Sequence, residues 1–250
     1  MTSNRFFVKK SDIKSSTFLL YGDEHHHLSR VARIKPEEKV WFFDEQGTNY
    51  LAKVEEIRKD VTRMSILQTL DKNKPKIEIT LAQALLKSKK MDLIIQKSTE
   101  LAVTNIIPVV TSRTIVKVEE KIQKKIERWK KIALEAVKQS QKSFLPSISS
   151  PITIEKLVER KGDERKLLLS EKKGKYLRDI LIESSSSELN IPKPPSSVLI
   201  LIGPEGGWTD EEEKFILNNG YEAVSLGEQT LRAETAALCS LVLISHFWNL

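Results

Sequence analysis

The fold that we expect for this chain follows from residues 197–207, which read Ser-Val-Leu-Ile-Leu-Ile-Gly-Pro-Glu-Gly-Gly. The consecutive apolar residues 198–202 are closed by Gly203-Pro204, which is typical of a strand buried on both faces of a sheet. The proline and the pair Gly206-Gly207 exclude regular structure after that strand. Residues 209–212, Thr-Asp-Glu-Glu, then match the capping box of a helix start. This order predicts an α/β fold with a ligand site beyond the carboxyl end of the strand.

A second stretch of the same kind follows at residues 224–237, Val-Ser-Leu-Gly-Glu-Gln-Thr-Leu-Arg-Ala-Glu-Thr-Ala-Ala. A short strand, Val224 to Leu226, ends at Gly227, and Arg232 opens an apolar helix that we expect to reach about Trp248. Glycines in one α/β loop often serve only to turn the chain. Because two buried strands here each end in glycine and lead into a helix, we expect their loops to form two walls of one pocket.

The composition of the first loop argues against a phosphate-binding nucleotide site. A Walker loop needs Gly-Lys-Ser/Thr at its end, whereas this loop has no lysine and carries Glu205 in its middle, where a carboxylate would repel phosphate. The Rossmann pattern Gly-x-Gly-x-x-Gly is also missing. A ligand with positive charge and no phosphate fits the loop better.

Taken together, these motifs resemble the bacterial 16S ribosomal RNA uridine-N3 methyltransferases, which belong to the knotted SPOUT class and use S-adenosylmethionine. The similarity covers nearly the whole chain. It rests on Gly203-Pro-Glu-Gly-Gly207, Leu226-Gly227, Leu231-Arg-Ala-Glu-Thr-Ala236, Arg5-Phe-Phe7, Phe43-Asp-x-x-Gly47 and Gln96-Lys-Ser-Thr-Glu-Leu101.

The chain reads as two domains joined at the charged stretch Asp71-Lys-Asn-Lys-Pro75. Residues 1–72 contain short strands, tight turns and one small helix, which predicts a compact β-barrel. Residues 75–250 alternate strands with helices, which predicts a parallel α/β sheet. The resemblance implies that the barrel is PUA-like and grips RNA, and that the second domain is a SPOUT-type parallel sheet with a C-terminal trefoil knot.

The resemblance also implies that S-adenosylmethionine binds between the two glycine-containing loops, which their chemistry permits. Backbone groups there can hydrogen-bond the adenosine, and leucines can enclose the ring. The residues expected to hold the cofactor are Leu201, Ile202, Gly203, Pro204, Glu205, Gly206, Gly207, Leu226, Gly227, Leu231, Arg232, Thr235 and Ala236.

Two residues are candidates for the chemistry at uridine N3, which must lose its proton. Arg232 can stabilise the negative charge that develops on O2 or O4. Glu234 is a candidate base, but it could equally orient Arg232 or stabilise the start of the helix.

The net charge of +7 is concentrated in the middle of the chain. Residues 75–142 carry a balance of +8, against +3 for residues 1–74 and −4 for residues 143–250. A basic face favours a phosphate backbone, although lysine-rich helices are often only solvated faces. The candidate RNA-binding residues are Arg5, Arg30, Arg33, Lys124, Lys125, Lys131 and Lys142.

Two residues depart from the family pattern. Ala102 stands where the family usually has glycine, and if that position has a positive φ at a helix end, alanine costs about 1 kcal/mol. Lys142 stands where the resemblance predicts arginine, and lysine lacks the planar bidentate fork.

Composition bounds the remaining expectations. With Cys239 as the single cysteine there is no disulfide within the chain, and the sequence shows neither a signal-peptide pattern nor an apolar run of membrane-spanning length, so we expect a cytoplasmic protein without membrane contact. We expect no metal at His25-His-His27, because adjacent histidines on a helix diverge. The last helix is apolar nearly all round, which predicts a homodimer unless neighbouring helices cover it.

Two alternatives stay open. One is a related SPOUT methyltransferase that acts on transfer RNA or on a ribose 2′-hydroxyl, whose pocket loops would look alike; the N-terminal Arg5-Phe-Phe7 barrel favours the uridine-N3 branch. The other is a non-catalytic RNA-binding or ribosome-assembly protein with a vestigial pocket.

Overall fold

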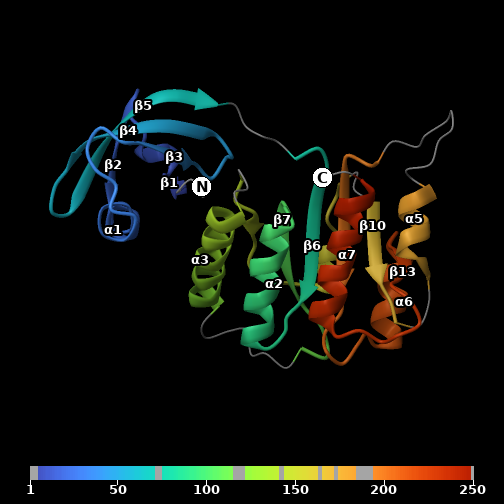
Figure 1. Ribbon diagram of the computed structural model, residues 1–250. Coiled ribbons are helices and arrows are strands. Elements are labelled where there is room, and N and C mark those ends of the chain that lie inside the picture. Colours follow the sequence, from blue (N-terminus) through green and yellow to red (C-terminus); the bar gives the residue numbers. More distant parts are fainter. Residues whose placement is uncertain are drawn as a thin grey trace, which may run out of the picture. The chain divides into compact units, whose positions relative to one another are not determined.

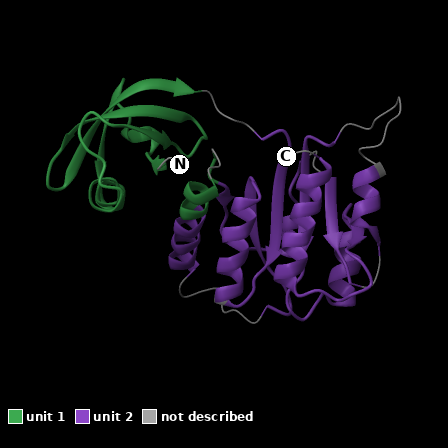
Figure 2. Cartoon of the chain, in the orientation of Figure 1, with its two compact units in different colours: residues 1–74, 134–145 green, residues 75–133, 146–250 purple. Residues whose placement is uncertain are grey.

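The computed structural model describes residues 5–70, 75–114, 122–140, 144–162, 165–171, 174–183 and 194–248. The chain divides into two compact units, one of residues 1–74 with 134–145 and one of residues 75–133 with 146–250 (Figure 2). The sequence did not indicate that residues 134–145, which include the end of a long helix, group with the N-terminal unit. No helix among the described residues is both long and apolar enough to cross a membrane.

The N-terminal unit is a five-stranded sheet with strand order β1-β3-β4-β5-β2. All its pairings are antiparallel except that of β1 with β3. In the recorded pairings β1 and β2 are the two edges, so hydrogen bonds among the described strands do not close the expected barrel. The strands are β1 (Arg5–Phe7), β2 (Thr17–Tyr21), β3 (Lys39–Phe43), β4 (Asn49–Ile57) and β5 (Val61–Leu70).

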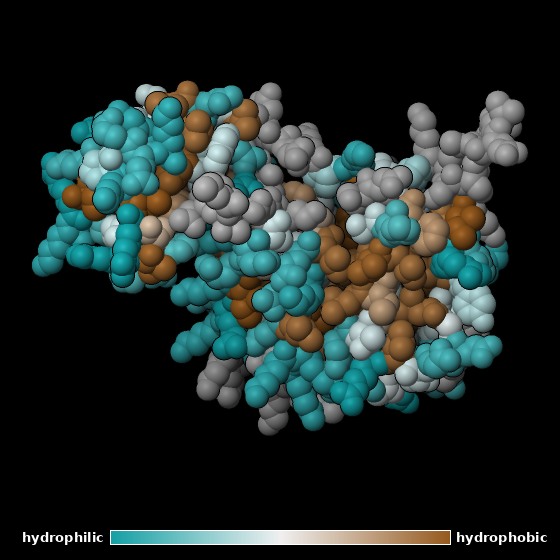
Figure 3. All heavy atoms as spheres, in the orientation of Figure 1, coloured by the Kyte–Doolittle hydropathy of each residue, from teal (hydrophilic) through white to brown (hydrophobic). Residues whose placement is uncertain are grey.

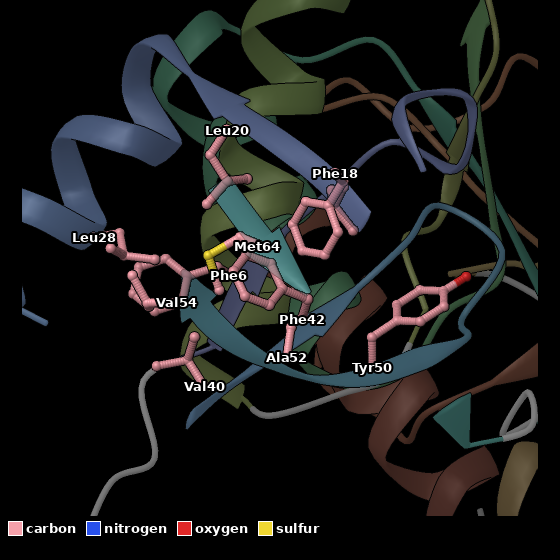
Figure 4. Close-up of a cluster of buried hydrophobic side chains, with 11 residues drawn as sticks. Phe6, Phe18, Leu20, Leu28, Val40, Phe42, Tyr50, Ala52, Val54 and Met64 are labelled. Atoms are coloured by element: carbon pink, nitrogen blue, oxygen red, sulfur yellow. The ribbon is translucent and has the colours of Figure 1, made fainter. Parts of the chain in front are cut away.

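Alternating apolar residues of these strands build one core, in which Phe6, Phe18, Phe42 and Met64 converge from four strands (Figure 4). The unit also contains short helices, with Leu28 packed in the same core. They are the 3₁₀ turn η1 (Lys10–Asp12), α1 (Gly22–His26) and the π-helical turn η2 (His27–Val31).

The three adjacent histidines have three different environments. His25 is buried, with Nδ1 2.8 Å from Thr62 Oγ1 and Nε2 3.1 Å from Lys59 O. His26 is exposed, and the ring of His27 lies 5.2 Å from that of Phe6. The described residues contain no cluster of three or more potential metal ligands.

The C-terminal unit is an eight-stranded sheet in which every recorded pairing is parallel. The strand order is β11-β13-β10-β12-β6-β7-β8, with β9 also paired to β7. The strands are β6 (Glu78–Ala84), β7 (Asn105–Val110), β8 (Ser147–Ile148), β9 (Ile152–Thr153), β10 (Arg165–Leu169), β11 (Lys175–Tyr176), β12 (Ser197–Ile202) and β13 (Glu222–Ser225).

The helices of this part of the chain are α2 (Ser88–Glu100), α3 (Ile122–Ser140), α4 (Ile154–Val158), α5 (Leu177–Glu183), α6 (Asp210–Asn218) and α7 (Ala233–Phe247). Helices α2 and α7 pack side by side over the sheet (Figure 1). On the other side, Leu199 and Leu201 of β12 join a core cluster with residues of α4 and α6.

Strand β12 is buried on both faces, as the sequence predicted: residues 198–202 are all buried, and the strand pairs with β10 on one side and β6 on the other. Two short strands were not predicted from the sequence. Lys175 and Tyr176 form β11 against β13, and the helix that follows begins only at Leu177. Strand β8 is the other. Both strands have two residues, so a period of two cannot show in their sequence.

Ala102 has the backbone conformation expected of a helix-terminating glycine. It follows Leu101, the C-cap of α2, and has a φ of +64°. The amides of Leu101, Ala102 and Val103 donate back to carbonyls in the last turn of α2. Helix α2 therefore ends at an alanine in the left-handed backbone conformation, where glycine is usual.

Candidate active site

A cavity of about 480 Å³ lies at the carboxyl ends of β10, β12 and β13. Its size is within the usual range for small-molecule sites. Most of its lining comes from three segments, residues 169–171, 202–208 and 225–233, with Ala236 from α7 and Lys90 from α2. The two loops that the sequence singled out therefore form walls of one cavity, and the end of β10 adds a third.

The first wall is the glycine-rich loop after β12. At Gly203 a Cβ atom would lie 3.0 Å from the ring of Trp208, so the backbone and the indole are too close for most side chains. The indole Nε1 donates to Leu169 O at 3.1 Å, which ties the loop to the end of β10. The predicted capping box is present: Thr209 and Glu212 each accept a hydrogen bond from the other's backbone amide at 3.1 Å.

The loop after β7 holds this glycine loop in place. Arg113 Nη1 donates to Gly206 O at 2.5 Å and to Trp208 O at 3.3 Å. The amide of Ser112 donates to Glu212 Oε1 at 2.8 Å. The backbone of the loop is thus held from the end of β7, which lies two strands away from β12 in the sheet.

The second wall is the loop after β13. Ser225 Oγ accepts from Gly227 N at 3.2 Å and donates to Gly227 O at 3.0 Å, and Gly227 has a φ of +139°, which glycine adopts without strain. The tight turn brings Leu226 and Leu231 to the cavity.

Ten of the thirteen residues predicted to hold the cofactor line the cavity: Ile202, Gly203, Pro204, Glu205, Gly207, Leu226, Gly227, Leu231, Arg232 and Ala236. The other three do not. Leu201 is fully buried in the core cluster because alternation along β12 turns its side chain away from the face of Ile202. Gly206 presents its carbonyl to Arg113, and Thr235 is exposed on α7.

Three charged residues form an ion cluster beside the cavity. Lys90 Nζ, in the first turn of α2, lies 2.5 Å from Glu205 Oε1 and 3.4 Å from Glu234 Oε1. The hydrogen bond with Glu205 is the main cause that raises the pKa of Lys90. The cluster carries a net charge of −1 and joins α2, the glycine loop and α7.

Arg232 and Glu234 lie near each other in sequence but do not pair. Glu234 is 13% exposed and its Oε2 is enclosed, with no hydrogen-bond partner among the described residues. Arg232 is the N-cap residue of α7, is exposed, and forms no hydrogen bond or ion pair with any residue in the described part of the chain. Its guanidinium is therefore available to a ligand.

Sequence reasoning missed several lining residues. Ser170 and Glu171 directly follow β10, so the strand-end rule that found the other loops would also have found them. Lys90 and Trp208 carried no comparable signal. Lys90 enters the site from a helix start, and Trp208 stands between the glycine pair and the capping threonine.

The predicted RNA-binding residues differ in their availability. Arg30, Arg33, Lys124 and Lys131 are exposed, and Lys125 is half-buried. Arg5 is half-buried, hydrogen-bonds Asn49, and lies 5.3 Å from the centre of the Phe43 ring; burial lowers its pKa. Arg5 therefore serves at least in part to hold the N-terminal unit together. Lys142 lies outside the described residues.

The lining carries charges of both signs. Two carboxylates, Glu171 and Glu205, and two cations, Lys90 and Arg232, line the cavity, and the carboxylates offer partners to a positively charged group of a ligand. Glycine backbone on two walls offers amide and carbonyl groups at close approach. The apolar side chains of Ile202, Leu226 and Leu231 can enclose a flat ring. The residues present thus fit S-adenosylmethionine.

Known proteins similar to this chain are RNA methyltransferases. The family model for an RNA methyltransferase domain matches residues 72–245, and the model for an RNA methyltransferase PUA domain matches residues 20–61. A Bacillus subtilis (strain 168) protein named ribosomal RNA small subunit methyltransferase E is 32% identical over 251 residues, covering 97% of this chain and 96% of that protein.

Two solved structures are similar over 98% of both chains. One is a Legionella pneumophila protein described as a putative methyltransferase in complex with the bound cofactor SAM, with 29% identity and a TM-score of 0.86. The other is a ribosomal RNA small subunit methyltransferase E from Neisseria gonorrhoeae bound to S-adenosyl methionine, with 29% identity and a TM-score of 0.81.

Proposed function

We propose that this chain, which belongs to the ribosomal RNA small subunit methyltransferase E family of RNA methyltransferases, methylates N3 of a uridine in small-subunit (16S) ribosomal RNA, with S-adenosylmethionine as the methyl donor. The observation that carries the proposal is the cavity at the ends of β10, β12 and β13. Relatives whose structures contain this cofactor share the fold over nearly the whole chain.

The two glycine-containing loops would hold the cofactor. Gly203, Pro204 and Gly207 offer backbone groups on one wall, and Leu226 with Gly227 forms the other. When bound, the cofactor supplies an electrophilic methyl group on a positively charged sulfur. The carboxylates at the cavity suit that charge, and the clamp from Arg113 keeps the loop backbone in its binding geometry without reorganisation.

Arg232 would stabilise the reacting uracil. Loss of the N3 proton spreads negative charge over O2, N3 and O4, and a guanidinium placed at the cavity can donate to these oxygens. Two features support this role. Arg232 lines the cavity, and no described residue uses its hydrogen-bonding capacity. A cation at the start of a helix is disfavoured by the helix dipole, so an anionic partner is expected there.

The RNA would contact the N-terminal unit and the basic stretch of the second unit. The match to a PUA domain supports the first contact, and the exposed lysines at the start of α3 support the second. Phosphate contacts of this kind position an RNA without reading its sequence. A cytoplasmic location follows from this substrate.

Two further features of the architecture belong to the proposal. Strand β13 lies on the far side of β10 from β12, yet the following helix α7 returns to contact α2 and β12. That return supports a C-terminal trefoil knot. Helix α7 keeps apolar residues at its surface, with Val242 49% exposed, and Figure 3 shows apolar side chains gathered over this layer of helices. This supports a homodimer built on α7.

Mass mapping of ribosomal RNA tests the function. Small-subunit RNA from cells that lack this protein should lose one methyl group on a single uridine, and adding the purified protein with S-adenosylmethionine should restore it. An unchanged RNA would argue against the proposal. Calorimetric titration with S-adenosylmethionine separates an enzyme from a vestigial pocket, which should give no heat of binding.

A further inference from the structure

The carboxylates around the cavity differ in access. Glu205 lines the cavity, and its side chain is 27% exposed. Its Oε1 pairs with Lys90, while its Oε2 makes no hydrogen bond with any residue that the structure describes. Glu234 does not line the cavity, and its Oε2 is enclosed. A substrate proton can therefore reach Glu205 directly but can reach Glu234 only after a rearrangement.

We propose that Glu205 is the catalytic base that accepts the N3 proton of uridine, and that Lys90 is the positioning residue that aims it; this rests on the function proposed above. A base must lie within hydrogen-bond reach of the proton that it removes, so access decides between the two glutamates. Glu205 sits on the loop that binds the cofactor, which places the proton acceptor next to the methyl donor.

Lys90 explains how one loop glutamate is held in a defined orientation. It contacts Glu205 on the glycine loop and Glu234 on α7, so the carboxylate of Glu205 is fixed against two helix starts. Because Lys90 occupies Oε1, it leaves Oε2 for the substrate. Lys90 stands in the first turn of α2, where the helix dipole disfavours a cation, and the two glutamates offset that cost.

In the proposed step the N3–H bond of uridine breaks, its proton joins Glu205 Oε2, and its electron pair stays on N3. That pair forms the bond to the methyl group, and the pair of the broken carbon–sulfur bond stays on the sulfur of the cofactor. Glu205 then returns its proton to water.

Other charged groups share the site. Glu171 faces the cavity from the end of β10, Arg232 from the start of α7, and Arg113 is held by the glycine-loop carbonyls. None of them contacts Glu205 in the recorded ion pairs and hydrogen bonds of the described residues. Lys90 is the charged residue that pairs with Glu205, and it also contacts Glu234.

The test compares two substrates that differ in the acidity of N3–H. Small-subunit RNA is prepared with uridine or with 5-fluorouridine, whose fluorine makes N3–H more acidic, in the form that the wild-type protein methylates. With uridine, Glu205→Gln should lower the single-turnover rate about 100-fold, the scale of general base catalysis. With 5-fluorouridine the loss should shrink at least about tenfold, because a more acidic proton needs less help from a base.

Cofactor affinity and a matched control separate catalysis from binding. Glu205→Gln removes one of the two carboxylates that face the cavity and should weaken S-adenosylmethionine binding, but at saturating cofactor its single-turnover rate should still be about 100-fold low. Glu211→Gln, the same change at an exposed position of α6 outside the cavity, should keep the wild-type rate on both substrates. If Glu205→Gln does not fold, Glu205→Asp retains a misplaced carboxylate and should show the same substrate-dependent loss.

The positioning role of Lys90 is tested by comparing its variants with and without Glu205. Lys90→Met should slow methylation, Lys90→Arg should recover much of the rate, and Lys90→Met combined with Glu205→Gln should be no slower than Glu205→Gln alone. Equal losses on both substrates, or a lost cofactor affinity with a normal rate at saturation, would overturn the role of Glu205. A wild-type protein that methylates neither RNA would instead overturn the proposed function.

Discussion

Ala102 shows how one backbone angle carries a stability cost. Its φ of +64° is unfavourable for any residue with a Cβ atom and favourable for glycine. We expect Ala102→Gly to raise the free energy of unfolding by about 1 kcal/mol, which corresponds to a rise of about 2–4 °C in melting temperature for a chain of this length. Thermal unfolding followed by circular dichroism measures this.

The control for Ala102 is an alanine with an ordinary angle. Ala32, at the end of η2, has a φ of −76°, so Ala32→Gly should lower stability because the unfolded chain gains freedom. Equal effects of the two substitutions would show that the left-handed angle is not the cause.

Arg232 is the residue at which rate and stability should separate. Since its side chain is exposed and unpaired among the described residues, Arg232→Ala should change the free energy of unfolding by less than about 0.5 kcal/mol. The single-turnover rate should fall about 100-fold or more, as for loss of one donor to a developing anion, and Arg232→Lys should recover it only in part. A rate within about threefold of wild type would rule out the catalytic role.

At the scale of elements, α3 has two kinds of basic side chain. Arg128 pairs with Asp92 of α2 at 2.7 Å, and Lys138 pairs with Glu24 and Glu135. These two are engaged within the protein. Lys124 and Lys131 are exposed, form no ion pair with any residue that the structure describes, and lie seven residues apart on one face.

Reversing the free charges of α3 should weaken RNA binding. Replacing Lys124, Lys125 and Lys131 with Glu should lower RNA affinity and flatten its dependence on salt. Each lost phosphate contact removes about 0.7–0.9 from the slope of log affinity against log salt concentration. S-adenosylmethionine affinity should not change. Lys124→Glu and Lys130→Glu form a matched pair on two faces of the helix, and equal losses would mean that only net charge matters. An unchanged RNA affinity of the triple variant would sink the prediction.

For the molecule as a whole, the exposed apolar residues of α7 predict the oligomeric state. A terminal helix packed on one sheet normally keeps a polar face, whereas α7 exposes Val242 and half-exposes Leu238 and Leu243. Val242→Glu should convert a dimer to a monomer, because an unpaired charge in an apolar interface is costly.

Light scattering at micromolar concentration measures this change. Phe215→Glu is the control. Phe215 is 40% exposed on α6, so this substitution removes a similar apolar surface from another part of the molecule. A wild-type protein with the mass of a monomer would decide against the dimer.

The features that depend on neighbouring residues could be predicted from local sequence. The buried strand β12, its glycine turn and the capping box of α6 follow from residues 197–212, because proline, glycine and a threonine cap act on the backbone next to them. The left-handed angle at Ala102 was raised only as a condition, because the resemblance puts a glycine at that position. The resemblance added the cofactor and the substrate, which neither the periodicity nor the spacing of residues could supply.

Contacts between residues that are far apart in the sequence could not be predicted and became visible only in the folded chain. Arg113 contacts Gly206 across 93 positions of sequence, and Lys90 reaches Glu205 and Glu234 from another helix. Strand order creates these contacts, and no local pattern encodes it. Leu201 is a different case: the resemblance assigned it to the cofactor, but the alternation of side chains along β12 turns it into the core. Strand order also explains why Glu205, and not Glu234, faces the cavity.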